Sequence, residues 1–595
     1  MGMLNEYYHP LNISLVLGAV TIFFFLDVVG WWFDRKILQS PVFLRPVFWI
    51  YGLGLFIFYW FLLHFQFTYS PSFIIWSSVP WLIVCLPEYL MKNGWKSLLD
   101  FLFLNKLPLF FLSLLIPALF VKSSLPPYLT DEAAYHFISP WEATHGVWDF
   151  NQYRFYVNIP KLLDIFFALP FSIFKTYSVS RLLHFIFTFS CIYSITVWIK
   201  QRFGFKASAV FVWLYMFLQQ DLLIIGTSGY IDYSSGAAIA LCIVLILELL
   251  IWSNYHIFLV ATLLWGMALG MKYVSLIPFI SWGILYLLMS IKDGRKTKLL
   301  TMITGGILGI TFGGYWYIKN WIFTGNPIYP FLFGCKLPVC FKPSGYFDGW
   351  TTPITFQSFF DIVTNLLSGH TLLTVLLIVS TVILLLRKGK SAGKVGLFIV
   401  STLLLDFVLM KNVSGFLSRY YFYVQILFLM IIALPFALSN LKIYKVIVIL
   451  FTFLNMLFTL KTTYWIWNYL SPQEVYYAIG KTNINHWLND RHGENGELIK
   501  WCGTQGEKLL NIIDDGLLYT QDEQTMNIFN VNCRLNIFDF FKDSYLFDQK
   551  GTIWFATRSR CQKGVKIADE RQNQRNEILC KSVNITKNLY RYDNN

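Results

Sequence analysis

Long apolar stretches dominate the pattern of this chain from residue 12 to about residue 462. Each is roughly 17 to 25 residues long, the length that an α-helix needs to cross the hydrocarbon core of a bilayer. The pattern predicts about fourteen membrane-spanning helices. A short stretch at 255–270 also fits a broken or re-entrant helix. The expected spans are 12–33, 46–66, 72–91, 106–122, 180–199, 207–224, 234–253, 255–270, 274–291, 299–318, 371–386, 395–410, 420–438 and 444–462.

The pattern changes after Leu470. An amphipathic stretch near 472–490 and strand-like runs such as 552–556 follow, separated by polar segments. These features predict a small soluble α/β domain of about 120 residues. The expected fold class is therefore an all-α polytopic membrane protein with a C-terminal α/β domain. It divides into extra N-terminal helices at 1–105, a main transmembrane domain at 106–462 and the soluble domain at 463–595.

Composition agrees with a membrane protein, and the charge argues against a nucleic-acid partner. The chain is 56% hydrophobic and 13% charged, with a mean hydropathy of +0.53 and a net charge of +14. Residues 471–595 carry 16 basic and 16 acidic side chains. Of the 47 basic and 33 acidic residues in the whole chain, 31 and 17 therefore lie in the membrane part. The basic excess therefore belongs to the membrane part, where it is concentrated in the loops between the spans.

Basic residues gather in alternate loops, which by the positive-inside rule are cytoplasmic. Both termini and the other loops are then outside, including the large loops 123–179 and 319–370 and the shorter loops 225–233 and 411–419. We expect a multi-pass protein of a bacterial inner or plasma membrane, rather than of the endoplasmic reticulum. The basic groups are Arg35/Lys36/Arg45, Lys92/Lys96/Lys106, Lys200/Arg202/Lys206, Lys292/Arg295/Lys296/Lys298, Arg387/Lys388/Lys390/Lys394 and Lys442/Lys445.

The cysteines follow the same division. Three of them lie in apolar spans and are expected to be small buried hydrophobic residues: Cys85, Cys191 and Cys242. The other six fall on the predicted outer side, where an even number indicates disulfides in an oxidising compartment. Cys335 and Cys340 are the expected local pair, whereas pairing among Cys502, Cys533, Cys561 and Cys580 stays open.

Acids are rare near the spans, and Asp131-Glu132 is therefore a candidate site. The pair lies in the first large outer loop, and Tyr135 and His136 follow it. Ionisable groups at a membrane are costly, so they are functional hypotheses by default. The alternative is a helix cap formed by Thr130 or Asp131.

Three more charged residues fall at the same predicted face. Asp232 begins the seventh span, Lys272 ends the eighth and Arg419 precedes the thirteenth. Each has a structural alternative, because the acid can cap a helix and the cations can extend to the interface. Together they provide acids that can deprotonate a hydroxyl and cations that can hold a phosphate.

The order of these motifs resembles the GT-C superfamily of polytopic glycosyltransferases, which includes protein O-mannosyltransferases and the lipid A aminoarabinose transferase. The resemblance covers roughly residues 106–462. Three apparent extra spans before residue 106 depart from it, and the tail shows no recognisable domain, so the resemblance does not identify the acceptor. The motifs that carry it are Asp131-Glu132, Asn158-Ile-Pro-Lys161, Ser180-Arg181-Leu-Leu183, Gly266-Met-Ala-Leu-Gly270-Met-Lys272-Tyr273, Asn320-Trp-Ile-Phe-Thr-Gly325-Asn-Pro-Ile-Tyr-Pro330 and Ser418-Arg419-Tyr420.

The resemblance implies a sugar donor linked to a polyprenyl monophosphate. Such a donor enters from the bilayer, which fits a chain without a phosphate-binding glycine loop. The acceptor is a hydroxyl of a lipid, a glycan or a protein on the extracytoplasmic face. Asp131 would be the general base of an inverting transfer, and Glu132 would orient the acceptor or tune Asp131.

The other roles follow from the same resemblance. Lys272 and Arg419 would bind the donor phosphate, and Asp232 would be an outer-sphere acid or a metal ligand. The substrate-lining residues would be Tyr135, His136, Tyr273 and Tyr420. Some relatives use a divalent metal such as Mg²⁺ or Mn²⁺ and others use none, so both alternatives stay open. Two other functions compete: a polyprenyl-diphosphate-dependent ligase or polymerase, and a secondary transporter.

Overall fold

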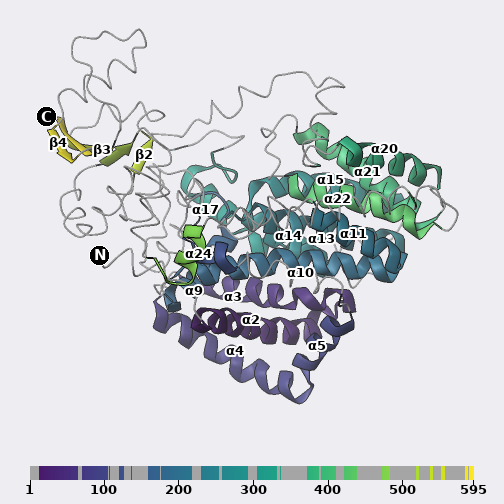
Figure 1. Cartoon of the computed structure of the whole chain (residues 1–595), viewed down its shortest axis with the longest axis horizontal. Helices are drawn as coiled ribbons and strands as arrows, with labels where there is room; N and C mark the ends of the chain where they lie inside the picture. Colours follow the sequence, from purple (N-terminus) through teal and green to yellow (C-terminus); the bar gives the residue numbers. More distant parts are fainter. Residues whose placement is uncertain are drawn as a thin grey trace, which may run out of the picture.

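A computed structural model shows a bundle of apolar helices (Figure 1). It contains five helices long and apolar enough to cross a membrane and six shorter apolar ones, counted over the described part of the chain. The chain is thus a helical membrane protein, while the number of fourteen spans stays a prediction. The structure describes residues 13–64, 70–104, 106, 120–125, 136, 158–174, 176–217, 230–252, 257–292, 305–307, 309–330, 336, 363, 367, 371–387, 390–410, 421–438, 446, 472–482, 517–520, 537–539, 551–556, 583–586 and 589–594.

The N-terminal helices form one layer of the bundle (Figure 1). They are α2 (Ile13–Phe33), α3 (Phe48–His64), α4 (Pro71–Met91) and α5 (Gly94–Leu104). Glycines allow α2 and α3 to approach closely: a Cβ at Gly30 would lie 1.6 Å from the Phe48 carbonyl oxygen. Helix α5 corrects the sequence analysis, which expected only a basic loop between the third and fourth spans.

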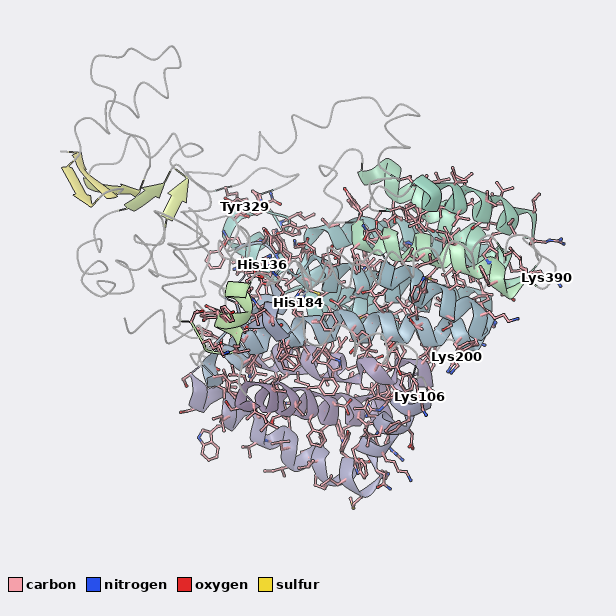
Figure 2. All side chains as sticks on the ribbon, in the orientation of Figure 1. Lys106, His136, His184, Lys200, Tyr329 and Lys390 are labelled. Atoms are coloured by element: carbon pink, nitrogen blue, oxygen red, sulfur yellow. The ribbon has the colours of Figure 1, made fainter. Side chains whose placement is uncertain are left out.

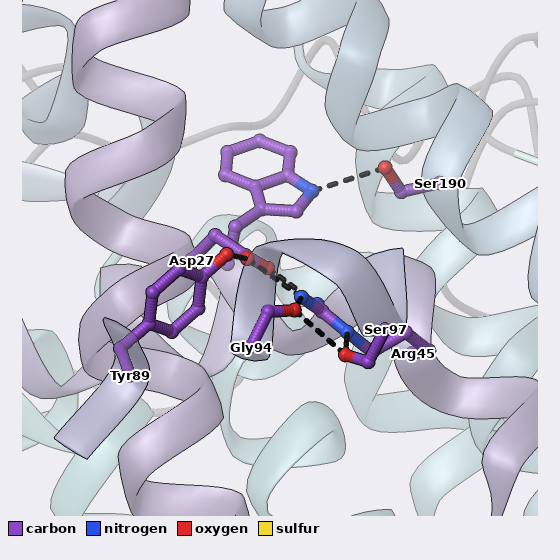
Figure 3. A network of polar contacts seen from close by, with 7 residues as sticks. Asp27, Arg45, Tyr89, Gly94, Ser97 and Ser190 are labelled. Atoms are coloured by element: carbon purple, nitrogen blue, oxygen red, sulfur yellow. Dashed lines mark hydrogen bonds and ion pairs between the residues drawn. The ribbon is translucent and has the colours of Figure 1, made fainter. Parts of the chain in front are cut away.

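A buried polar network joins the helices of this layer (Figure 3). Arg45 donates to both oxygens of Asp27, at 2.6 and 2.8 Å, and Tyr89 donates to Asp27 at 2.8 Å. Two further guanidinium protons reach the Ser97 hydroxyl at 2.9 Å and the Gly94 carbonyl at 3.1 Å. The network therefore connects α2, α4, α5 and the 3-10 turn Val42–Val47.

The rest of the bundle packs beside this layer. Its helices are α9 (Leu162–Phe174), α10 (Ser178–Phe203), α11 (Phe205–Phe217), α13 (Asp232–Trp252), α14 (Ile257–Met271), α15 (Leu276–Lys292), α17 (Tyr315–Thr324), α20 (Thr371–Leu386), α21 (Ser391–Met410) and α22 (Phe422–Ala433). Helices α14 and α15 match the expected pair 255–270 and 274–291, and α14 is a continuous helix rather than a broken one.

Glycines also set the distance between α14 and the helical residues before α17. A Cβ at Gly313 would lie 1.8 Å from the Gly266 carbonyl oxygen, and one at Gly266 would lie 2.2 Å from that of Gly309. Small residues let transmembrane backbones approach in this way. The contact brings Lys272, just after α14, to the same end of the bundle as α17.

Basic side chains and the candidate site lie toward opposite ends of the bundle. Figure 2 shows Lys106, Lys200 and Lys390 at one end, and His136 and Tyr329 at the other. This separation agrees with the alternation of basic loops in the sequence. Which end faces the outside stays a prediction.

The orientation can be measured by labelling in intact cells. A cysteine introduced at Gly345, in the predicted outer loop 319–370, should react with a membrane-impermeant maleimide. A cysteine at Gly389, beside Lys390, should react only after the membrane is permeabilised, because the basic loops are expected inside. The reverse pattern of labelling would contradict the proposed orientation.

The tail contains one short helix and a sheet. Helix α24 spans Pro472–Ala478. The strand order is β2-β1-β3-β5-β4, with β1 parallel to β2 and β3 and with β5 antiparallel to β3 and β4. That these elements form a separate soluble α/β domain stays a prediction. The strands are β1 (Leu517–Thr520), β2 (Ile537–Asp539), β3 (Gly551–Ala556), β4 (Val583–Thr586) and β5 (Leu589–Asn594).

The three cysteines in the bundle are buried free thiols, which confirms their interpretation as small core residues. The six cysteines of the predicted outer side, including Cys335 and Cys340, lie outside the described residues.

Candidate functional site

The structure describes four of the predicted site residues. They are His136, Asp232, Lys272 and Tyr273. His136 and Tyr329 lie at the end of the bundle opposite Lys106, Lys200 and Lys390 (Figure 2). Tyr273 contacts Tyr329, and its neighbour Lys272 pairs with Asp232. The other five predicted residues lie outside the described ranges: Asp131, Glu132, Tyr135, Arg419 and Tyr420.

Lys272 and Asp232 form an ion pair between two helix ends. Asp232 is the first residue of α13, where the helix dipole favours a carboxylate. Lys272 has an extended backbone (φ −152°, ψ 146°) between α14 and the 3-10 turn Tyr273–Ser275. Its ammonium donates to Asp232 Oδ1, and both side chains are nearly buried. Lys272 therefore points into the bundle rather than toward the membrane interface.

Hydroxyl contacts hold this junction together. Ser275 donates to the Ala268 carbonyl at 2.8 Å, and its oxygen lies 3.2 Å from that of Ser235 in α13. Trp265 of α14 donates to the Ser275 carbonyl at 3.4 Å. Ser275 thereby ties the turn after Lys272 to both α13 and α14, which fixes the backbone that carries the lysine.

A second acidic contact lies nearby. His136 Nδ1 is 2.8 Å from Asp164 Oδ1, and both side chains are fully buried. The charges of Lys161, Lys272 and Asp232 act on the Asp164 carboxyl. Asp164 is therefore close enough to both lysines and to Asp232 to interact with their charges. The five side chains form what we call the polar cluster: His136, Lys161, Asp164, Asp232 and Lys272.

Tyr273 belongs to an adjoining hydrogen-bond network. Asn320 of α17 donates to the Tyr273 hydroxyl at 2.8 Å and to the Asn158 carbonyl at 2.9 Å. The Tyr273 hydroxyl donates to the Tyr329 carbonyl at 3.0 Å. The motif residues 158, 273, 320 and 329, far apart in the sequence, are thus joined at one end of the bundle.

The loop after α17 is held by its own side chains. Gly325 has a φ of 73°, a left-handed conformation that favours glycine. Asn326 accepts from the Ile328 amide at 2.9 Å, and Thr324 accepts from the Asn326 amide at 3.0 Å. These contacts explain why the sequence Thr-Gly-Asn-Pro follows the helix, since they turn the chain toward Tyr329.

Sequence reasoning missed part of the polar cluster. Asp164 was not among the predicted site residues, and Lys161 and Asn320 appeared in motifs without a role. Asp164 is an acid in the apolar helix α9, with Lys161 three residues before it. A buried acid in such a helix is costly. An acid in an apolar helix, with a lysine three residues before it, was therefore the sequence signal that could have identified Asp164.

Metal binding stays a prediction. Within the described ranges, no group of three or more His, Cys, Asp or Glu side chains could hold a metal ion. Asp131 and Glu132 lie outside those ranges. Asp232, the candidate metal ligand, is paired with Lys272 through Oδ1.

Comparisons with known proteins support a fold rather than a sequence family. No family model and no curated protein sequence matches the chain. The crystal structure of ArnT from Cupriavidus metallidurans in the apo state is similar at a TM-score of 0.50, with 12% sequence identity. The match covers 84% of this chain and 98% of that one. The chain is therefore a helical membrane protein with a fold similar to that of ArnT, and the resemblance expected from its motifs agrees with this likeness.

Proposed function

We propose that the chain is a membrane glycosyltransferase that moves a sugar from a polyprenyl-phosphate carrier to a hydroxyl group on the extracytoplasmic face. The observation that carries this proposal is the polar cluster at the end of the bundle opposite the basic loops. Two cations, two carboxylates and a histidine are gathered there among apolar helices. Such groups are costly in a membrane and are retained for function.

The reaction needs a base and a stabilised leaving group. The acceptor oxygen attacks the anomeric carbon while the bond between that carbon and the phosphate oxygen breaks. Asp131 takes the hydroxyl proton, and the polyprenyl phosphate leaves with the bonding electrons. Glu132 orients the acceptor, and Lys272 and Arg419 stabilise the charge that grows on the phosphate.

The contacts of three described residues support this proposal. Asp232 holds Lys272 at the end of α13, so it fixes the cation where the donor phosphate would bind. Lys161 lies near enough to Asp164 to influence its charge and supplies a second cation to the cluster. Tyr273 is held by Asn320 and would line the substrate site with Tyr135, His136 and Tyr420. The proposed partners are a lipid-linked donor, a lipid, glycan or protein acceptor, and the surrounding membrane lipids.

Lys272→Met should weaken the handling of the donor. The substitution keeps the length of the side chain but removes the charge, and hydrogen bonds to charged groups contribute about 1.5 to 3 kcal/mol. We expect donor kcat/KM to fall by roughly 10- to 100-fold. The measurement is transfer from a synthetic polyprenyl-phosphate sugar in nanodiscs.

Two further variants test whether the loss of activity comes from the charge at Lys272. Lys272→Arg keeps the charge and should retain more activity than Lys272→Met. Lys390→Met removes an exposed lysine at the opposite end of the bundle and should behave like the wild type. Unchanged kcat/KM in Lys272→Met would remove Lys272 from the proposed donor site. Transfer from a polyprenyl-diphosphate sugar alone would favour the ligase alternative.

Metal dependence is decided in the same assay. Transfer is measured after treatment with EDTA and again after addition of Mg²⁺ or Mn²⁺. Loss and recovery of transfer would place a divalent ion with the acidic side chains, where it would stabilise the charge on the leaving phosphate. Unchanged transfer would leave that stabilisation to Lys272 and Arg419.

A further inference from the structure

An ion pair links the C-terminal segment to the base of the first outer loop. Lys122 Nζ lies 3.0 and 2.9 Å from the two carboxylate oxygens of Glu474, and the contact joins residues 352 positions apart. Glu474 belongs to α24, whereas Lys122 is in the helical residues 120–124. Both side chains are nearly buried. Because a buried charge needs its partner, the pair ties α24 to the bundle.

Arg181 secures the same junction from a third element. It is buried at the start of α10 and donates to the Leu125 carbonyl, with a longer contact of 3.4 Å to that of Lys122. Burial raises the pKa of the Tyr477 hydroxyl in α24, and the nearby charge of Arg181 lowers it. Arg181 is therefore close to α24 as well. We call Lys122, Arg181, Glu474 and Tyr477 the latch.

The latch holds the residues that lead directly into the loop with the proposed catalytic acids. Leu125 is fixed by Arg181, and Asp131 follows only six positions later. Six residues span at most about 20 Å when fully extended. The position of Leu125 therefore limits where Asp131 and Glu132 can be placed, and α24 contributes to that position.

We propose that the C-terminal segment is a positioning element of the transferase, in which α24, held by the latch, fixes the start of the loop that carries Asp131 and Glu132. The inference rests on the proposed function. We expect undocking of α24 to release Leu125, and with it the start of the loop that carries Asp131, while leaving Lys272 and Asp232 in place. The latch therefore controls kcat and leaves the donor KM unchanged, whereas a merely structural contact would change only the amount of folded protein.

The first variant is Glu474→Gln in the full-length protein in nanodiscs. Hydrogen–deuterium exchange of peptides from 120–135 and 472–482 should rise, because the charge of Lys122 is no longer balanced by the Glu474 carboxylate. Sugar transfer per folded molecule should show a kcat roughly 10- to 100-fold lower with an unchanged donor KM, since misplacement by about 1 Å has effects of this size. Lys481→Gln, which removes an exposed charge just beyond α24, is the matched control and should match the wild type in both measurements.

Swapping the two charges of the ion pair separates a positioning role from general destabilisation of the protein. Lys122→Glu should resemble Glu474→Gln, and the double variant Lys122→Glu/Glu474→Lys should recover slow exchange and most of kcat. The double variant also provides the test when a single variant fails to fold.

Faster hydrogen–deuterium exchange of α24 with unchanged kcat would overturn the positioning role and leave the proposed function standing. Unchanged exchange in every variant would show that the latch does not hold α24. Absence of transfer by the wild type would instead overturn the proposed function, and the positioning role with it.

Discussion

Asp131→Asn should lower sugar transfer by roughly 10² or more, the usual scale for losing a general base. Asparagine keeps the shape of the side chain but cannot accept the proton of the attacking hydroxyl. Donor binding should change little, because the cations Lys272 and Arg419 are retained. The measurement is turnover of a synthetic polyprenyl-phosphate sugar in detergent or nanodiscs, normalised to folded protein.

Asp100→Asn is the matched control for this experiment. Asp100 is exposed in α5, in the layer of N-terminal helices, and it should tolerate the change. Near-wild-type turnover of folded Asp131→Asn would mean that the acid pair only caps a helix. The mechanism proposed above would then be wrong, while the fold would be unaffected.

Arg45→Met should destabilise the protein by about 3 to 5 kcal/mol, the scale for removing one partner of a buried ion pair. Asp27 is almost completely buried, and Arg45 supplies two of the hydrogen bonds to its carboxylate. Without Arg45, a negative charge would remain in the N-terminal layer with Tyr89 as its donor. Stability is measured by unfolding of the purified protein in detergent.

The double variant Asp27→Asn/Arg45→Met tests whether the buried charge of Asp27 causes the loss of stability. Removing both charges should recover most of the lost stability, because neither charge is then buried alone. Lys92→Met is the control, since Lys92 pairs with Glu88 at an exposed position and should unfold like the wild type. Wild-type stability of Arg45→Met would show that the network of Figure 3 does not hold the layer together.

The sequence determined the membrane class and the positions of many helices. Apolar length is a local property that the bilayer thickness converts directly into a span. The expected span 371–386 accordingly coincides with α20, and the span 12–33 with α2. Helix α5 was missed because it is only 11 residues long and its flanking lysines matched the pattern of a basic loop.

The sequence also indicated the candidate site in part. Lys272 and Asp232 were selected because each is a charge at the end of an apolar run, and the structure pairs them directly. Their roles in donor binding stay predictions, as do those of Asp131, Glu132 and Arg419. The motif order indicated the GT-C superfamily because the motifs alternate with spans, and the likeness to ArnT agrees with that fold.

Only the tertiary structure decided which distant side chains meet. Asp164 lies 28 positions from His136, and Glu474 lies 352 positions from Lys122, so neither pairing has a local signal. Each depends on how separate elements pack against one another. Glycines such as Gly266 and Gly313 contribute to that packing elsewhere in the bundle, because they set the closest approach of two backbones. Local apolar length determined what enters the membrane, whereas helix packing decided which charges share a site.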